Sequence, residues 1–267
     1  MTTRVFFLGG GNMAAAIAGG LVKQGGYQVH IANRGAEKRE RLAAELGVAV
    51  SETLPPLTEN DVLVLAVKPQ DMQAACANVI HGGALVLSVA AGLSVSTLGR
   101  YLGGTRRIVR TMPNTPSKVG FGLTGLYAEP EISTADRAAA EAIMQAVGQT
   151  VWLNEEAQMH ALTGISGSGP AYVFYLLAAL QNAAQAQGFD AATARKLSLA
   201  TFQGAVELAQ QSGAGFAELQ QQVTSKGGTT HEAIETFKSH HMAEALSAGV
   251  AACVARSEAL AAQYEAV

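Results

Sequence analysis

Short apolar runs alternate with amphipathic stretches along the first 130 residues of the chain. The runs at 62–67 and 84–89 are apolar without alternation, which is typical of strands buried on both faces of a parallel sheet. The stretches between the runs space their apolar positions as helices do. The pattern predicts strands at 4–8, 28–32, 61–67, 85–89, 107–111 and 122–127, and helices at 13–23, 37–46, 71–79 and 96–102.

From residue 134 on, the pattern changes and helix follows helix. Alternating strands and helices predict an α/β fold, with an N-terminal Rossmann-like doubly wound sheet followed by an all-α C-terminal dimerisation domain. We place the domain boundary near residue 155, which gives domains 1–154 and 155–267. The predicted helices are 134–147, 155–163, 170–187, 190–212, 215–223, 230–238 and 241–264.

Composition narrows the classes of protein. Hydrophobic residues make up 49% of the 267 residues and charged residues 15%, so the chain can form a sizeable core. The net charge is −3 without clustered Lys or Arg, which argues against nucleic-acid binding. No segment approaches the roughly 20 apolar residues of a membrane span, so we expect no membrane partner.

Cysteine and histidine usage adds two expectations. Cys76 and Cys253 lack neighbours at metal-ligand or redox spacing, so we expect buried free thiols in a reducing compartment. The N-terminus enters a strand without a signal-peptide pattern, and we therefore expect a cytoplasmic protein. The six histidines are scattered, and we predict no metal site.

A glycine-rich turn follows the first predicted strand and has the form G-x-G-x-x-A. Gly9 permits the tight turn, Gly11 lets the backbone approach a pyrophosphate, and Ala14 lets helix and strand pack closely. The next helix presents free N–H groups to phosphate. The alternative is a glycine-rich turn without a ligand, which the strand–turn–helix context disfavours. The predicted cofactor contacts here are Leu8, Gly9, Gly10, Gly11, Asn12 and Met13.

The end of the second predicted strand bears on the choice of cofactor. An NAD-specific site carries Asp or Glu near this position, whereas this chain has Asn33 and Arg34, with Lys38 one helical turn on. Arg can pair with a 2′-phosphate that an acidic residue would repel. We therefore predict NADPH as the cofactor, with NADH possible at lower preference. The alternative for Arg34 is a solvated loop residue.

The chain carries the glycine-rich turn and further motifs at Phe7–Ala14, Ala66–Gln70, Met112–Pro116, Ser166–Tyr172, Val223–Thr230 and Arg256–Leu260. Across nearly its whole length and in the right order, it is similar to pyrroline-5-carboxylate reductase. The resemblance implies reduction of 1-pyrroline-5-carboxylate to L-proline with NADPH, the last step of proline biosynthesis. It also implies a helical domain that packs across a homodimer.

The resemblance assigns roles in the second half of the chain. It implies that Thr230 is catalytic and hydrogen-bonds the ring nitrogen of the substrate. It further implies that Ser225 and the backbone of Gly227, Gly228 and Thr229 hold the substrate carboxylate. From the residues alone, this loop is equally well interpreted as a threonine-capped helix start.

The remaining predicted cofactor contacts follow other strands at their carboxyl ends, where ligands of open parallel sheets bind. For Lys68 we favour a phosphate-facing or surface position over a general acid. Ser168 is interpreted as part of a helix start and not as a nucleophile. These further contacts are Ala66, Val67, Lys68, Pro69, Ala90, Ala91 and Asn114.

The chain departs from the usual pattern of this family at two positions. Lys226 stands where the family usually has Pro, and His160 where it usually has an acidic residue.

Two alternative functions remain. One is another NADP-dependent imine or hydroxy-acid reductase of the same architecture. The helix from Pro170 has no lysine before Lys196, which argues against a β-hydroxyacid dehydrogenase. The other is a catalytically silent NADP-binding regulator.

The sequence also bears on the oligomeric state. Helices 170–180 and 242–260 are more apolar than one buried face requires, which predicts a homodimer at least.

Overall fold

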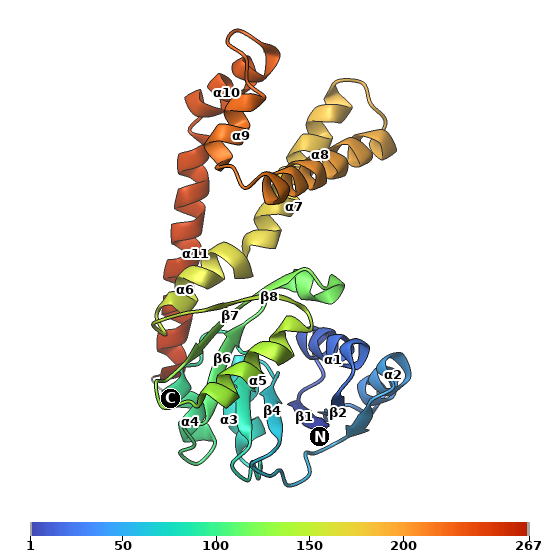
Figure 1. Cartoon of the computed structure of the whole chain (residues 1–267), viewed down its shortest axis with the longest axis vertical. Coiled ribbons are helices and arrows are strands. Elements are labelled where there is room, and N and C mark those ends of the chain that lie inside the picture. The colour runs from blue at the N-terminus through green and yellow to red at the C-terminus, as the bar shows by residue number, and fades with distance from the viewer. Residues whose placement is uncertain (1, 266–267) are drawn as a thin grey trace. The chain divides into compact units, whose positions relative to one another are not determined.

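The structure is a computed structural model that describes residues 2–265 of the chain (Figure 1). It divides into two compact units. The first comprises Met1–Ser168 and Cys253–Val267, and the second comprises Gly169–Ala252. The last turns of the C-terminal helix thus belong to the first unit. The boundary near residue 155 stays a prediction.

The first unit is built on one sheet, which has eight strands within the described residues. Its order is β3-β2-β1-β4-β5-β6-β7-β8, and all neighbours are parallel except β6 and β7. From β1 the chain moves outward to β2 and β3 and then returns to β4 on the other side of β1, so a ligand crevice is expected there. The strands are β1 Thr3–Leu8, β2 Tyr27–Ala32, β3 Ala49–Ser51, β4 Val62–Leu65, β5 Leu85–Ser88, β6 Ile108–Met112, β7 Gly122–Ala128 and β8 Gly148–Trp152.

Helices cover both faces of this sheet. Val5 and Phe7 of β1 join one apolar cluster, and Phe6 joins the other, because successive strand residues point to opposite faces. The first cluster includes Ile17 and Leu42 from α1 and α2, and the second includes Met72 from α3. The predicted doubly wound fold is therefore confirmed. The helices of this unit are α1 Asn12–Gln24, α2 Ala36–Leu46, α3 Met72–Cys76, α4 Val95–Tyr101, α5 Thr134–Gln145 and α6 Gln158–Leu162.

Shorter turns complete the unit, and two strands were not predicted. The 3₁₀ turns η1 Pro69–Asp71 and η2 Thr115–Val119 follow β4 and β6, and α6 continues into a π turn, Thr163–Gly167. β3 has only three residues, too few for a periodic signal. β8 alternates between half-buried and exposed positions. It begins directly after the predicted helix 134–147.

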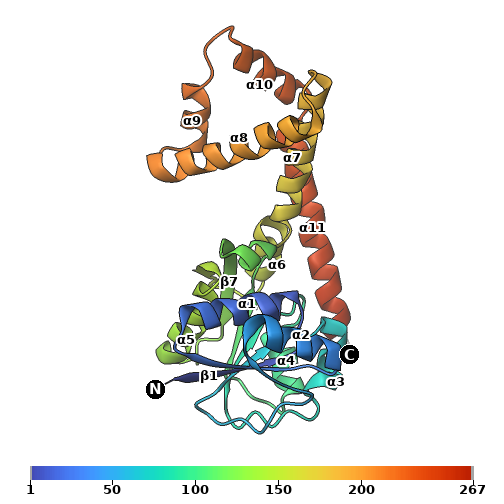
Figure 2. The same ribbon diagram turned by 90° about the vertical axis from the view of Figure 1, so that its right-hand side faces the viewer.

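The second unit is helical (Figure 2). α7 and α8 pack against each other, and the Asp190 side chain caps α8 by accepting a hydrogen bond from the Thr193 N–H. Large apolar side chains remain exposed on this unit, among them Phe174 at 66% and Tyr175 at 77%. Such a surface indicates an interface with another protein chain. The helices are α7 Gly169–Ala186, α8 Ala191–Ser212, α9 Phe216–Gln222, α10 Thr229–Ser239 and the first part of α11 Met242–Glu265, up to Ala252.

α11 requires a correction to the expectation that no segment is long and apolar enough for a membrane. Its 24 residues qualify by length and composition alone. Two features of α11 are also typical of a helix that packs within a folded domain. Arg256 and Glu258 are charged residues within it, and Tyr264 packs against the second apolar cluster of the first unit.

A partly buried ion pair in the first unit predicts acid sensitivity of folding. Arg107 binds Asp136 through two hydrogen bonds of 2.6 and 3.0 Å, and this contact lowers the pKa of the Asp136 carboxyl. Since the folded pKa is depressed, the stabilisation is present above the ordinary pKa of 3.8 and is lost as pH falls through the folded value.

We expect Asp136→Asn to lower the free energy of unfolding by about 1–2 kcal/mol at pH 7, a range that allows for the solvent exposure of Arg107. The difference from wild type should shrink at pH values below the ordinary carboxyl pKa. Urea unfolding at neutral and acidic pH measures it. An equal difference at both pH values would contradict this account.

Candidate cofactor and substrate sites

The glycine-rich turn between β1 and α1 has the geometry that its sequence predicts. Gly9 adopts φ +99°, which is unfavourable for other residues, and a Cβ there would lie 2.7 Å from the Ala66 carbonyl oxygen. Gly11 is the N-cap of α1 at an ordinary φ of −70°, and no side chain caps the helix. Ala14 is fully buried, as expected for close packing of helix and strand. The first N–H groups of α1 are therefore available to an anion.

Unlike Gly9, Gly11 has open space where a Cβ would lie. A Cβ at Gly11 would meet only the Ala66 carbonyl oxygen, at an unstrained 3.8 Å. Neither the backbone conformation nor the packing of the protein requires glycine at this position. A close approach of a ligand does explain it.

A cleft of about 480 Å³ lies beside this turn. Nine of the predicted cofactor contacts line it, namely Leu8, Gly9, Gly10, Gly11, Asn33, Arg34, Ala66, Val67 and Lys68. The sequence analysis missed Thr53 and Leu54, because they follow the unpredicted β3, and also Ala74, Ala75, Asn78 and Val79 from α3 and its end. A signal was available for the α3 residues, since they follow the Val67–Pro69 turn by one or two helical turns.

The other predicted contacts lie outside the lining of this cleft. Asn12 and Met13 begin α1, and Pro69 begins η1. Ala90 is buried, with its N–H on the Ser88 hydroxyl at 3.3 Å, whereas Ala91 is exposed. Their cofactor contacts stay predictions.

Asn114 has protein partners for both ends of its amide. Its nitrogen donates to the carbonyl oxygen and hydroxyl of Ser166, at 3.1 and 3.2 Å, and its oxygen accepts the Leu123 N–H at 2.9 Å. These bonds hold the π turn against the start of β7. Within the structure Asn114 therefore has a positioning role, and its predicted contact with the cofactor stays a prediction.

The charges at the cleft suit a phosphate. Arg34 and Lys38 are exposed at its edge, and neither has an ion-pair partner among residues 2–265. Glu52 and Asp71 also line the cleft, but no acidic residue stands at the end of β2. The turn, the helix N-terminus and the two cations together fit a phosphorylated dinucleotide.

The loop before α10 contains the predicted substrate residues. The Gly228 N–H donates to the Ser225 carbonyl oxygen at 3.0 Å, which closes a turn in which Gly227 adopts φ +70°. The prediction that threonine caps this helix is wrong, because Gly228 is the N-cap and no side chain caps the helix. Thr229 and Thr230 are instead the first two residues of α10, where free N–H groups gather.

The predicted catalytic residue Thr230 is the second residue of α10. Its side chain is half-buried, and in the described part of the chain its hydroxyl makes no hydrogen bond. By contrast, the hydroxyls of Thr224 and Thr236 bond to carbonyl oxygens four residues earlier.

Comparisons with known proteins identify the family. A family model for pyrroline-5-carboxylate reductase dimerisation matches residues 156–260, and one for coenzyme F420-dependent NADP oxidoreductases matches residues 4–92. The chain is 40% identical to a pyrroline-5-carboxylate reductase of Pseudomonas aeruginosa over 268 aligned positions, which cover 98% of each chain. The chain belongs to the pyrroline-5-carboxylate reductase family.

Solved structures agree with this assignment. A pyrroline-5-carboxylate reductase of Coxiella burnetii is 36% identical, with a TM-score of 0.88 over 97% of this chain and 99% of its own. A Plasmodium falciparum pyrroline carboxylate reductase with NADP bound shares the fold at 24% identity, with a TM-score of 0.84 over 97% of this chain and 98% of its own.

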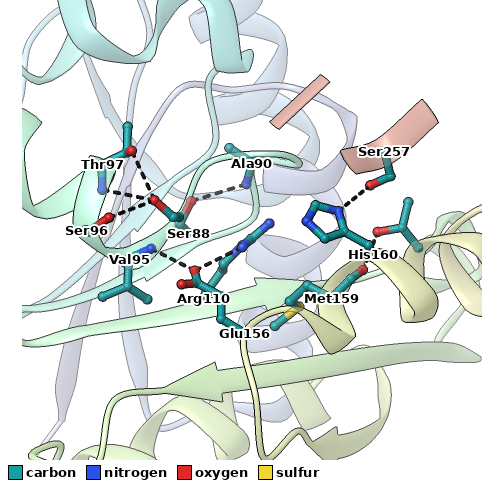
Figure 3. Close-up of polar contacts among 12 residues, drawn as sticks. Ser88, Ala90, Val95, Ser96, Thr97, Arg110, Glu156, Met159, His160 and Ser257 are labelled. Atoms are coloured by element: carbon teal, nitrogen blue, oxygen red, sulfur yellow. Dashed lines mark hydrogen bonds and ion pairs between the residues drawn. The ribbon is translucent and has the colours of Figure 1, made fainter. Parts of the chain in front are cut away.

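His160, which departs from the usual acidic residue of the pyrroline-5-carboxylate reductase family, has a defined partner. Its Nδ1 lies 2.9 Å from the Ser257 hydroxyl of α11 (Figure 3). In the part of the chain that the structure describes, no group of three His, Cys, Asp or Glu side chains is placed to hold a metal ion.

A second polar contact in Figure 3 joins the segment before α6 to β6 and to the start of α4. One carboxylate oxygen of Glu156 accepts from Arg110 Nη1 at 2.9 Å and from the Val95 N–H at 2.8 Å. The Arg110 side chain is only 7% exposed, so Glu156 neutralises a buried charge.

We expect Glu156→Gln to lower the free energy of unfolding by up to about 3 kcal/mol, because it leaves a buried cation without its counter-charge. Thermal unfolding measures this loss. The matched control is Glu155→Gln, whose exposed carboxylate has no partner within residues 2–265. Equal melting temperatures for the two variants would contradict a stabilising role for Glu156.

Proposed function

We propose that this protein reduces 1-pyrroline-5-carboxylate to L-proline with NADPH as the hydride donor. Membership of the family supports the reaction. The observation in the structure that carries the cofactor assignment is the glycine-rich turn over a cleft edged by Arg34 and Lys38. Bound NADPH supplies the hydride, and the chain's own residues bind, orient and polarise.

The cofactor end of the proposal rests on charge and shape. The N-terminus of α1 and the open space at Gly11 suit a pyrophosphate. Arg34 pairs with the 2′-phosphate in this proposal, and the neutral Asn33 avoids the repulsion that an acidic residue would introduce. NADPH is accordingly preferred over NADH.

The substrate end of the proposal rests on the loop Ser225–Thr230. The free N–H groups at the start of α10 and the Ser225 hydroxyl bind the substrate carboxylate. The Thr230 hydroxyl hydrogen-bonds the ring nitrogen, which holds the imine in one orientation as its nitrogen gains a proton.

The activity is tested by following NADPH absorbance with 1-pyrroline-5-carboxylate, and NADH in parallel. We expect oxidation of both cofactors, with the higher kcat/KM for NADPH. Oxidation of NADPH with other cyclic imines but not with this substrate would contradict the substrate assignment. Equal kcat/KM for both cofactors would contradict the role of Arg34.

We further propose that the protein is a homodimer at least and acts in the cytoplasm. The exposed apolar side chains of the second unit and an apolar cavity of about 600 Å³ within it support the dimer. Both cysteines are free, which suits a reducing compartment. Cys76 is buried as expected, and burial raises the pKa of its thiol to about 11. Cys253 is only partly buried, contrary to expectation. Sedimentation showing a stable monomer at micromolar concentration would contradict the dimer.

A further inference from the structure

The loop that joins β2 to α2 carries the residues that distinguish the two nicotinamide cofactors. Asn33 and Arg34 line the cleft from this loop, and Gly35 caps α2. The Asn33 side chain accepts the Gly10 N–H at 3.2 Å and donates to the Gly35 carbonyl oxygen at 3.2 Å. The conformation of the loop is thereby coupled to that of the glycine-rich turn.

Arg39, one turn into α2, holds the same loop from its other side. Its Nη1 donates to the carbonyl oxygens of both Asn33 and Arg34, at 2.7 and 2.8 Å. Arg39 has no carboxylate partner among the described residues. Hydrogen bonds from a charged donor are among the stronger ones in proteins, so this contact fixes the peptide groups on both sides of the Arg34 Cα.

Arg39 itself does not line the cleft, whereas Arg34 does, and the Arg34 guanidinium has no hydrogen-bond or ion-pair partner among residues 2–265. We infer that Arg39 is a positioning residue for NADPH selectivity, which acts by fixing the loop that presents Arg34 to the 2′-phosphate. The inference rests on the proposed cofactor and adds a residue that does not touch it. Fixing the loop before binding lowers the entropy that a flexible arginine loses when it pairs with phosphate.

The test measures binding to the adenosine end of the site alone, independently of turnover. Isothermal titration with 2′,5′-ADP and with 5′-AMP separates the contribution of the 2′-phosphate. We expect Arg39→Met to weaken 2′,5′-ADP binding by about tenfold and 5′-AMP binding by about twofold or less. Arg39→Lys, which keeps the charge but lacks the planar fork, should recover only part of the loss. Arg41→Met is the matched control on the same helix, since Arg41 is exposed and its one ion-pair partner among residues 2–265 is Glu45, at 3.8 Å.

A double mutant separates positioning from direct attraction. If Arg39 acts through Arg34, then Arg39→Met has little further effect on 2′,5′-ADP binding in an Arg34→Met background. Additive losses, or full recovery in Arg39→Lys, would show that the charge of Arg39 attracts phosphate directly and would overturn the inference. Equal losses for both nucleotides would also overturn it. Failure of the wild type to bind 2′,5′-ADP more tightly than 5′-AMP would instead contradict the proposed cofactor.

Discussion

Replacing Thr230 by valine is expected to lower kcat/KM for 1-pyrroline-5-carboxylate by about 10–100-fold, the cost of losing one hydrogen bond to a group that gains charge. Valine matches threonine in shape, and the hydroxyl makes no hydrogen bond among the described residues, so the fold should be unaffected. Steady-state kinetics at saturating NADPH measure the loss.

The controls for Thr230 separate its hydroxyl from its position on α10. Thr230→Ser keeps the hydroxyl and should retain most of the activity. Thr236→Val, on the same helix, removes a hydroxyl that bonds to the Glu232 carbonyl oxygen within its own helix, and it should leave kcat/KM almost unchanged. Equal activity of wild type and Thr230→Val would contradict the catalytic role of Thr230, although the reductase assignment would stand.

The second large effect is expected at Gly11. Gly11→Ala should fold normally, because its φ of −70° suits alanine and its Cβ would contact only one atom, at 3.8 Å. The same Cβ would occupy the space into which we place the pyrophosphate, so NADPH affinity should fall by about tenfold or more. NADPH fluorescence titration measures the affinity, and thermal unfolding measures the fold.

Two other glycines calibrate this result. Gly215 is also a helix N-cap, with φ −67° and nothing within 4 Å of an added Cβ, so Gly215→Ala should affect neither binding nor stability strongly. Gly9→Ala should lower stability and binding together, because it strains a φ of +99° and contacts the Ala66 carbonyl oxygen. Unchanged NADPH affinity in Gly11→Ala would place the pyrophosphate elsewhere.

The central strands were predictable because burial on both faces leaves a strong signal. The run from Val62 to Leu65 is apolar at every position, and the structure buries all four residues. β3 was not predictable, since it has three residues and its pairing with β2 is a tertiary contact. The residues that follow β3 were missed as cleft residues for the same reason.

The turn at Gly9 was predicted correctly because its φ of +99° depends on glycine itself. The positioning contacts of Arg39 and Asn114 were not predicted. Nothing in the spacing of Arg39 and Arg34 distinguishes a side chain that turns back onto carbonyl oxygens from one that extends into water. The bonds between Asn114 and Ser166 join residues 52 positions apart, and only the folded chain brings them together.

The central claim is that this chain makes L-proline from 1-pyrroline-5-carboxylate at the expense of NADPH. Chiral chromatography of the products formed from the racemic substrate, with NADPH consumption followed in the same sample, tests it most directly. The account predicts L-proline in an amount equal to the NADPH oxidised, with no D-proline. NADPH oxidation without L-proline, or no oxidation at all, would contradict it.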